Sequence, residues 1–222
     1  MNGALNRDDI LQLFNELAGK LKNRGVRGHI YIVGGAAMIF GFRRERTTHD
    51  VDARIENDKE AVLAAAAEIA EAHDLRTDWL NENATLFMPH GKDPRPRPVF
   101  NTPDLVVTGA STEHLLAMKL EAARESDADD IRTLLHSLGI RSESDAIAIH
   151  DGIFPRTPLR EHGLEILRTA IAARSTGQPS REGSTPETND TVPENPPRPP
   201  APAKGAADAA ARNAEQRGPS RS

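Results

Sequence analysis

The apolar residues near the start of the chain recur every three or four positions, as they do on one face of a helix. They are Ile10, Leu13, Phe14, Leu17 and Leu21. Asp8 or Asp9 can open such a helix, because acidic side chains favour the first turn, and Gly25 can close it. The first segment is therefore predicted to be an amphipathic helix.

Short apolar runs then alternate with helical stripes up to about residue 174. Strands are expected at 29–33, 50–55, 99–100 and 105–107. Helices are expected at 36–40, 59–72 (capped by Asn57 or Asp58), 112–123, 128–138, 144–151 and 158–174, with a helical turn at 79–84. A small mixed sheet with helices before and after it is typical of an α+β fold, here with a helical part at its C-terminal end.

The composition changes near Ser175. From there to Ser222 the chain contains no Leu, Ile, Met or aromatic residue, and nine of its sixteen prolines lie there. Such a segment cannot bury enough apolar surface to offset the entropy that is lost on ordering. We therefore expect one domain over residues 1–174 and a disordered Pro/Ala-rich tail over residues 175–222.

The charge of the chain limits the classes of function. Its net charge is −5, and the predicted tail is neutral, with six Lys/Arg and six Asp/Glu, so the excess acid belongs to the predicted domain. An acidic domain argues against broad, non-specific binding to nucleic acid, which depends on basic surface. Arg43, Arg44 and Arg46 still form a local basic cluster. The cluster could approach a triphosphate or an RNA backbone, and a solvated loop is the alternative.

Several classes of protein are excluded or disfavoured by what the sequence lacks. The chain has no cysteine, so disulfides and thiolate metal sites are excluded. No apolar run approaches the roughly 20 residues that span a bilayer. The polar N-terminus lacks the apolar core of a signal peptide. We expect a cytoplasmic protein with no membrane partner.

The segment from Thr47 to Ile55 carries the first candidate chemistry. Side chains alternate along a strand, so Asp50, Asp52 and Arg54 share one face, while the intervening apolar residues can pack on a core. Two carboxylates at this spacing can hold a divalent ion, and Mg²⁺ uses one or two protein carboxylates and completes its shell with water and phosphate oxygens. The alternative is an edge strand whose acidic side chains face water.

A glycine pair precedes this segment. The apolar run at 29–33 ends in Gly34 and Gly35, and a helix is expected to follow at once. Glycine permits close approach of a ligand to the backbone, and the start of a helix presents free N–H groups to a phosphate. A tight strand-to-helix turn without a ligand is the alternative. Nucleotidyl transfer requires a phosphate-binding turn beside two metal-binding carboxylates.

With these motifs in this order, the sequence resembles the minimal nucleotidyltransferases of the DNA polymerase beta superfamily. Their signature is a Gly-Gly or Gly-Ser turn, a spacer of about ten residues and D-x-D; the spacer here, from Gly35 to Asp50, is longer. The closest resemblance is to the AbiEii-type and MenT-type toxin nucleotidyltransferases. It extends from Val33 to Leu138 and includes the connector TDWLNENA and the run LLAMKLEAARESDADDIRTLL.

The second of these segments also carries polar residues that call for an explanation. Lys119 lies among apolar residues on its predicted helix, so it needs a partner or a ligand, unless its ammonium group reaches the surface. Asp127 and Asp130 lie at helical spacing with the following apolar stripe, and Asp127 could alternatively be a helix N-cap. Arg124 could pair with either aspartate and orient it, or form a surface pair.

The resemblance implies roles for these residues. Lys119 would contact the triphosphate, with Gly34, Gly35 and Arg124 also at the nucleotide. An aspartate of the Asp127/Asp130 pair would complete the catalytic site. Members of the superfamily often use a third carboxylate for the metal, and Asp104, just before the strand at 105–107, is the candidate; a turn acid after Pro103 is the alternative.

The resemblance also implies an activity. The chain is expected to transfer a nucleoside monophosphate from an NTP to an acceptor hydroxyl, using Mg²⁺ or Mn²⁺ held by Asp50 and Asp52. The toxin branch would add tRNA or another RNA as the acceptor and a cognate antitoxin as a partner. Two alternatives stay open, namely a catalytically silent module that binds a nucleotide or a partner, and an enzyme that modifies a small molecule such as an aminoglycoside.

Overall fold

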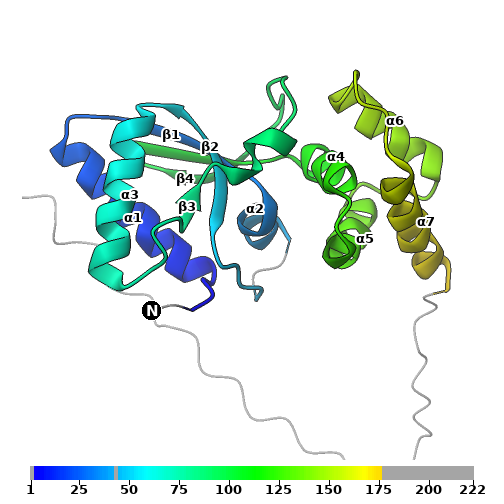
Figure 1. The fold of residues 1–222 in the computed structure, drawn as a ribbon, viewed down its shortest axis with the longest axis horizontal. Coiled ribbons are helices and arrows are strands. Elements are labelled where there is room, and N and C mark those ends of the chain that lie inside the picture. Colours follow the sequence, from blue (N-terminus) through cyan, green and yellow to red (C-terminus); the bar gives the residue numbers. More distant parts are fainter. Residues whose placement is uncertain (1–2, 43–44, 177–222) are drawn as a thin grey trace, which may run out of the picture. The chain divides into compact units, whose positions relative to one another are not determined.

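A five-stranded mixed sheet organises the part of the chain that the computed structural model describes, residues 3–42 and 45–176 (Figure 1). The strand order is β3-β2-β1-β5-β4. The strands are β1 (Gly28–Ile32), β2 (Val51–Asn57), β3 (Leu80–Asn81), β4 (Arg97–Asn101) and β5 (Leu105–Gly109). β1 pairs with β2 antiparallel and with β5 parallel, so the predicted mixed sheet and the α+β fold class are confirmed.

Helices lie before, between and after the strands, close to the predicted ranges. They are α1 (Arg7–Asn23), α2 (Gly34–Gly41), α3 (Lys59–His73), α4 (Thr112–Ala122), α5 (Ala128–Ser137), α6 (Glu143–Ile153) and α7 (Glu161–Thr176), with short 3₁₀ helices η1 (Asn83–Phe87) and η2 (Glu125–Asp127). The described residues all fall in one compact unit, Met1–Pro179. The predicted tail lies outside the described residues from residue 177 onward. None of the described helices is long and apolar enough to cross a membrane.

The first helix begins with a reciprocal cap. The side chain of Asn6 accepts hydrogen bonds from the N–H groups of Asp8 and Asp9 at 2.8 and 3.0 Å, and the Asp9 carboxylate accepts from the Asn6 N–H at 2.9 Å. Such a capping box satisfies donors that a helix start leaves free. The predicted opening at Asp8 or Asp9 is thus placed correctly, but Asn6 is the cap.

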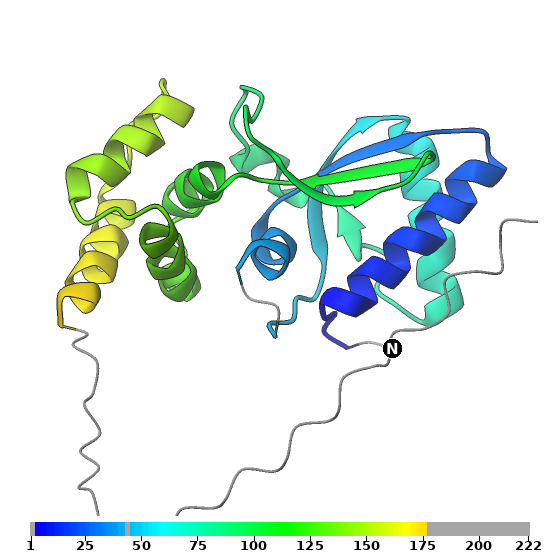
Figure 2. The same ribbon diagram turned by 180° about the vertical axis from the view of Figure 1, so that it is seen from behind.

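One face of the sheet is covered by α1 and α3, which lie side by side in both views (Figures 1 and 2). Leu21 from α1 and Val62 from α3 meet over Gly28 at the start of β1, where a Cβ atom would lie 2.8 Å from Leu21 Cδ1. The apolar stripe predicted for α1 is buried, and Phe14 within it contacts the rings of Phe40 and Phe100 at centroid distances of 6.5 and 6.0 Å. This packing forms the centre of the core.

The segment at 79–84 differs from its prediction as a helical turn. Trp79 is buried and donates its indole N–H to the carbonyl of Ala66 at 2.9 Å. The next two residues form β3, which pairs with Val51 and Asp52, and η1 follows. A two-residue strand has no periodicity to detect, because pairing with β2 rather than a local pattern creates it.

The predicted cap of α3 is also corrected in part, since Asp58 is the N-cap residue but has a φ of 50° and makes no side-chain cap hydrogen bond.

The parallel pairing of β1 and β5 decides where the helices meet. Gly28 is opposite Leu105 and Ile32 is opposite Gly109, so both strands end at the same edge of the sheet. α2 begins directly after β1, and α4 begins shortly after β5. α4 then packs against α5, α6 and α7, so the C-terminal helices are attached to the sheet at this edge.

The segment before β2 is tied to the start of the chain. Leu5 and Thr48 form an isolated antiparallel bridge, with N···O distances of 2.6 Å from Leu5 N to Thr48 O and 2.9 Å from Thr48 N to Leu5 O. Leu5 is buried in the core. The bridge fixes the backbone two residues before Asp50.

Replacing Phe14 with alanine is expected to lower the free energy of unfolding by about 3–5 kcal/mol, because it removes a fully buried ring and leaves a cavity. Urea unfolding followed by the fluorescence of Trp79 measures the change. Leu86→Ala is the matched control, since Leu86 is 91% exposed and its loss should change stability by less than about 0.5 kcal/mol. Equal effects of the two substitutions would contradict the core described here.

Candidate active site

A pocket of about 270 Å³ lies where α2 begins, and α4 lines it from Leu115 to Ala122. It brings together predicted site residues from four separate segments of the chain. They are Gly34, Gly35, Asp50, Asp52, Lys119, Arg124, Asp127 and Asp130. Residues predicted independently from two weak motifs and a distant helical segment therefore line one cavity.

The glycine turn is shaped by the side chains opposite it. Gly34 has a φ of 60°, a left-handed conformation that residues with a Cβ atom rarely adopt, and a Cβ there would lie 3.1 Å from Asp52 Oδ2. A Cβ on Gly35 would lie 2.8 Å from Thr48 Oγ1. α2 starts here without a side-chain cap hydrogen bond. The turn thus exposes the backbone N–H groups of the helix start beside the carboxylates, as a phosphate-binding turn requires.

The two carboxylates of the D-x-D motif lie close enough to influence each other. Burial raises the pKa of Asp52 above the ordinary carboxyl value, the neighbouring Asp50 carboxylate raises it further, and the Arg124 guanidinium lowers it. Asp50 is positioned from both sides, since Thr48 Oγ1 donates to its carbonyl at 3.1 Å and Asn81 Nδ2 donates to its Oδ2 at 3.4 Å. Two half-buried carboxylates that repel each other make a place where a cation is favourable.

The donor set suits a hard divalent ion. Asp50 and Asp52 offer carboxylate oxygens, which Mg²⁺ prefers, and Mg²⁺ commonly uses only one or two of them while retaining water and substrate oxygens. In residues 3–42 and 45–176, no group of three or more His, Cys, Asp or Glu side chains is arranged to hold a metal ion. The residues present therefore fit a metal that is completed by its substrate, and they do not form a closed structural metal site.

Lys119, Asp127 and Asp130 also line the pocket, where they form a buried ionic cluster. The Lys119 ammonium lies 2.7 Å from Asp127 Oδ1 and 2.9 Å from Asp130 Oδ2. Asp130 is 1% exposed and also pairs with Arg46 from the segment before β2. Burial of these charges is tolerated because each has an oppositely charged partner. The predicted need of Lys119 for a partner is met within the protein.

Arg124 has a different position from the one expected. From the sequence, Arg124 could pair with Asp127 or Asp130 or form a surface pair, whereas in the structure those carboxylates are held by Lys119 and Arg46. The Arg124 guanidinium instead lies 6.0 Å from the ring centroid of Phe87 and is close enough to Asp52 to lower its pKa. The correction follows from geometry, because η2 separates Arg124 from α5 and Lys119 on α4 is nearer to both acids.

Asp104 is not part of this pocket, so its prediction as a third metal ligand is corrected. Its carbonyl accepts a hydrogen bond from the N–H of Gly28, at the start of β1. The glycine turn follows the other end of β1, and five strand residues at about 3.3 Å each separate the two ends. β5 runs toward the pocket, so a residue that precedes it lies at the far edge of the sheet.

The structure adds residues to the site that the sequence did not identify. Thr48 limits the space at Gly35, Asn81 contacts Asp50, and Phe87 lines the pocket with 40% of its surface exposed. The sequence allowed Arg46 to approach a triphosphate or an RNA backbone, or to lie in a solvated loop; in the structure its side chain pairs with Asp130. Arg43 and Arg44 lie outside the described residues. The string TDWLNENA was the only signal for Asn81, and its strand pairing could not be foreseen.

Comparison with protein families identifies the class. The model of the family described as "Nucleotidyltransferase of unknown function (DUF6036)" matches residues 8–140, more than half of the 222 residues. The chain therefore belongs to this nucleotidyltransferase family. The match contains the glycine turn, the D-x-D motif and the Lys119 cluster, and it confirms the class predicted from them. Comparisons with curated proteins and with solved structures gave no match.

The glycine turn can be tested by Gly34→Ala. A side chain at φ 60° costs about 1–2 kcal/mol, and its Cβ would press on Asp52, so both stability and Mg²⁺-dependent binding of an NTP should fall. Thermal unfolding and equilibrium binding of a labelled NTP measure the two effects. In the control Gly19→Ala, on α1, the added Cβ meets no atom within 4 Å, so a gain of about 0.5–1 kcal/mol is expected without a change in binding. Unchanged NTP binding in Gly34→Ala would argue against the turn as a phosphate site.

The ionic cluster can be tested by Lys119→Met. Removing the ammonium leaves Asp130 buried with Arg46 as its remaining partner in the described ion pairs, which should cost about 3 kcal/mol of unfolding free energy. Arg132→Met is the matched control, because Arg132 and Asp129 form an exposed pair whose loss should cost less than about 1 kcal/mol. Urea unfolding compares them. Equal, small losses would show that Lys119 is not a structural part of the cluster.

Proposed function

We propose that this protein is an Mg²⁺-dependent enzyme that transfers a nucleoside monophosphate from an NTP to an acceptor hydroxyl. The acceptor oxygen forms a bond to the α-phosphorus, the bond between that phosphorus and the oxygen bridging to the β-phosphate breaks, and pyrophosphate leaves. The hydroxyl proton passes to solvent or to a carboxylate at the acceptor side. Family membership supports the reaction class, and the pocket supports the assignment of residues.

The observation that carries the metal dependence is the charge of the pocket. Its lining contains three cationic side chains and four carboxylates, which are listed here: Arg46, Lys119 and Arg124 against Asp50, Asp52, Asp127 and Asp130. Three positive and four negative charges leave a net charge of −1, so the protein alone does not attract a polyanionic triphosphate. A divalent ion on Asp50 and Asp52 reverses that sign. When bound, Mg²⁺ would supply charge neutralisation at the phosphates.

The remaining residues act on the nucleotide without a metal. The N–H groups at the start of α2, exposed by Gly34 and Gly35, are suited to the β- and γ-phosphates. Arg124 is exposed at the mouth of the pocket and is free of the ionic cluster, so it is the cation best placed to move onto a phosphate. Lys119, held by Asp127 and Asp130, contributes a fixed positive charge at the wall. This fixed position would favour the transition state, because no reorganisation is needed.

The pocket indicates less about the identity of the acceptor than about the nucleotide. By the resemblance to toxin nucleotidyltransferases, we propose the 3′ end of tRNA or another RNA as an acceptor, with an antitoxin as the partner that restrains the enzyme. A small-molecule acceptor of the aminoglycoside type is the second enzymatic proposal, and the acidic charge of the chain would suit such a cation.

One observation favours a catalytically silent nucleotide-binding module. Asn81, next to Asp52 in the β2–β3 pairing, presents an amide to Asp50 where a further carboxylate could have stood. An amide does not take a proton from an attacking hydroxyl. Mg²⁺-dependent NTP binding without turnover would identify such a module.

The deciding experiment incubates the purified protein with labelled NTPs, Mg²⁺ and total RNA, and follows transfer of label. Asp52→Asn should lower transfer by at least about 100-fold, because it removes metal-binding charge from the reacting centre. Glu68→Gln is the control, since Glu68 is an exposed acid on α3 that pairs with Lys20 and Arg24 and does not line the pocket. Chelation by EDTA should abolish both transfer and NTP binding. The proposal fails if the wild-type protein transfers no label to RNA, protein or small molecules, or if Asp52→Asn retains full activity.

A further inference from the structure

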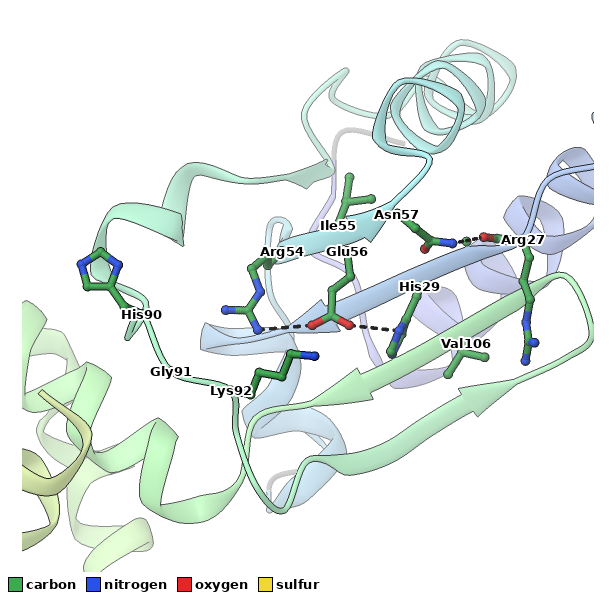
Figure 3. Close-up of a pocket in the computed structure, with 11 residues that line it drawn as sticks. Arg27, His29, Arg54, Ile55, Glu56, Asn57, His90, Gly91, Lys92 and Val106 are labelled. Atoms are coloured by element: carbon green, nitrogen blue, oxygen red, sulfur yellow. Dashed lines mark hydrogen bonds and ion pairs between the residues drawn. The ribbon is translucent and has the colours of Figure 1, made fainter.

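A second cavity, of about 850 Å³, lies on the sheet at residues of β1, β2 and β5 (Figure 3). The β2 residues 54–57 are all among its lining residues, and the side chains of Val51, Ala53 and Ile55 on the alternate positions are buried. Side chains two residues apart on a strand share a face, so Asp52, Arg54 and Glu56 follow one another along it. The cavity therefore continues the strand face that begins at the proposed metal site.

The charged residues around this cavity are mostly basic. Arg27, Arg54 and Lys92 carry permanent positive charges, and Glu56 is the carboxylate among the lining residues. Three positive charges and one negative charge leave a net charge of +2 before either lining histidine is protonated. Because the whole chain has a net charge of −5, this concentration of basic side chains is local. It attracts an anion and disfavours a cationic ligand.

Two of the charged groups are held in position by neighbours. Glu56 lies 3.3 Å from Arg54 Nη2 and 3.0 Å from His29 Nδ1, as the dashed lines in Figure 3 show. The Arg54 guanidinium also lies 5.0 Å from the ring centroid of Tyr31. Such support orients the guanidinium on the sheet while leaving its other N–H groups for a ligand.

Lys92 enters the cavity from the loop that crosses this face. The loop is fixed by the adjacent Asp93, whose Oδ2 accepts hydrogen bonds from Tyr31 Oη at 2.9 Å and from Ser111 N at 2.7 Å. Lys92 and Arg27 are both exposed, and within the described residues neither forms a side-chain ion pair. They are therefore cations whose charge the protein does not neutralise.

We propose that this cavity binds a phosphate group of the acceptor molecule, with the acceptor hydroxyl directed to Asp50 and Asp52. The inference rests on the proposed function and names the class of its second substrate. Arg54 lies two strand residues from Asp52, or about 7 Å, and Glu56 about 13 Å, so a phosphate near Arg54 leaves room for the sugar that carries the hydroxyl. The source of the phosphate is either the backbone of a single-stranded RNA 3′ end or a small phosphorylated acceptor. A polycationic aminoglycoside does not fit this charge.

The test measures direct binding of a fluorescein-labelled single-stranded RNA with a free 3′ hydroxyl, by fluorescence anisotropy without NTP. Arg54→Gln and Lys92→Gln should each weaken binding about tenfold, as expected for loss of a charge-assisted phosphate contact. Each should also lower the slope of log affinity against log salt concentration by about 1. Lys22→Gln, an exposed lysine on α1 over the opposite sheet face, is the control and should leave binding unchanged.

Glu56→Gln gives a prediction of opposite sign. Removing the one lining carboxylate raises the local positive charge and releases Arg54, so RNA binding should tighten several-fold. A merely structural role of Glu56 would not produce tighter binding. Circular dichroism melting of each variant separates a change of binding from a loss of folding.

Competition by a nucleoside monophosphate distinguishes the two sources of phosphate. If the nucleoside monophosphate displaces the RNA at a similar concentration of phosphate groups, and if its binding is equally sensitive to Arg54→Gln, the natural ligand is a small phosphorylated acceptor. If the RNA stays bound, the natural ligand is a polynucleotide. The inference is overturned if neither ligand binds, or if binding is insensitive to Arg54, Lys92 and Glu56. Phosphate binding without label transfer would reject the proposed function and keep the cavity, whereas transfer that is indifferent to these variants would keep the function and reject the cavity.

Discussion

The parallel pairing of β1 with β5 is the constraint on which the site depends. Because the two strands run in the same direction and end in register, α2 and α4 start from one edge of the sheet. The antiparallel β2 begins at this same edge and brings D-x-D beside the glycine turn, where Val33 donates to the carbonyl of Asp52 at 2.9 Å. Residues that are more than eighty positions apart in the chain thereby share one small pocket.

The charged residues that line the pocket form two groups, which differ in how far their charges are compensated. In one part of the pocket, Lys119 and Arg46 compensate the charges of Asp127 and Asp130. In another part, burial and the Asp50 carboxylate raise the pKa of Asp52 while the Arg124 guanidinium lowers it, so the charge of Asp52 is only partly compensated. Carboxylates whose charge is only partly compensated make a favourable place for a cation.

Much of this arrangement could be predicted from the sequence, because local patterns determine it. The stripe of α1, the alternation of β2 and the glycine pair each identify their element, and the order of the motifs identifies the class of protein. Asp104 was misplaced because the direction of β5 relative to β1 depends on the tertiary structure. A five-residue apolar run does not reveal that direction. The contacts of Arg124 with Phe87 and Asp52 and the pairing of Asn81 could not be read from the sequence for the same reason, since both depend on which segments become neighbours in space.

The bridge between Leu5 and Thr48 has a practical consequence for how the boundaries of this family are drawn. The family match begins at residue 8, yet the backbone of Thr48 is hydrogen-bonded to Leu5, before that point. The Thr48 hydroxyl limits the space at Gly35 and donates to the carbonyl of Asp50. The match ends at residue 140, although α4 and α5 also bury surface against α6 and α7. A chain shortened to 8–140 would retain every motif residue and the five strands, but it would lose the bridge to Thr48 and the helices that pack on α4 and α5. The segment that the family model matches is thus shorter than the part of the chain that packs around the pocket.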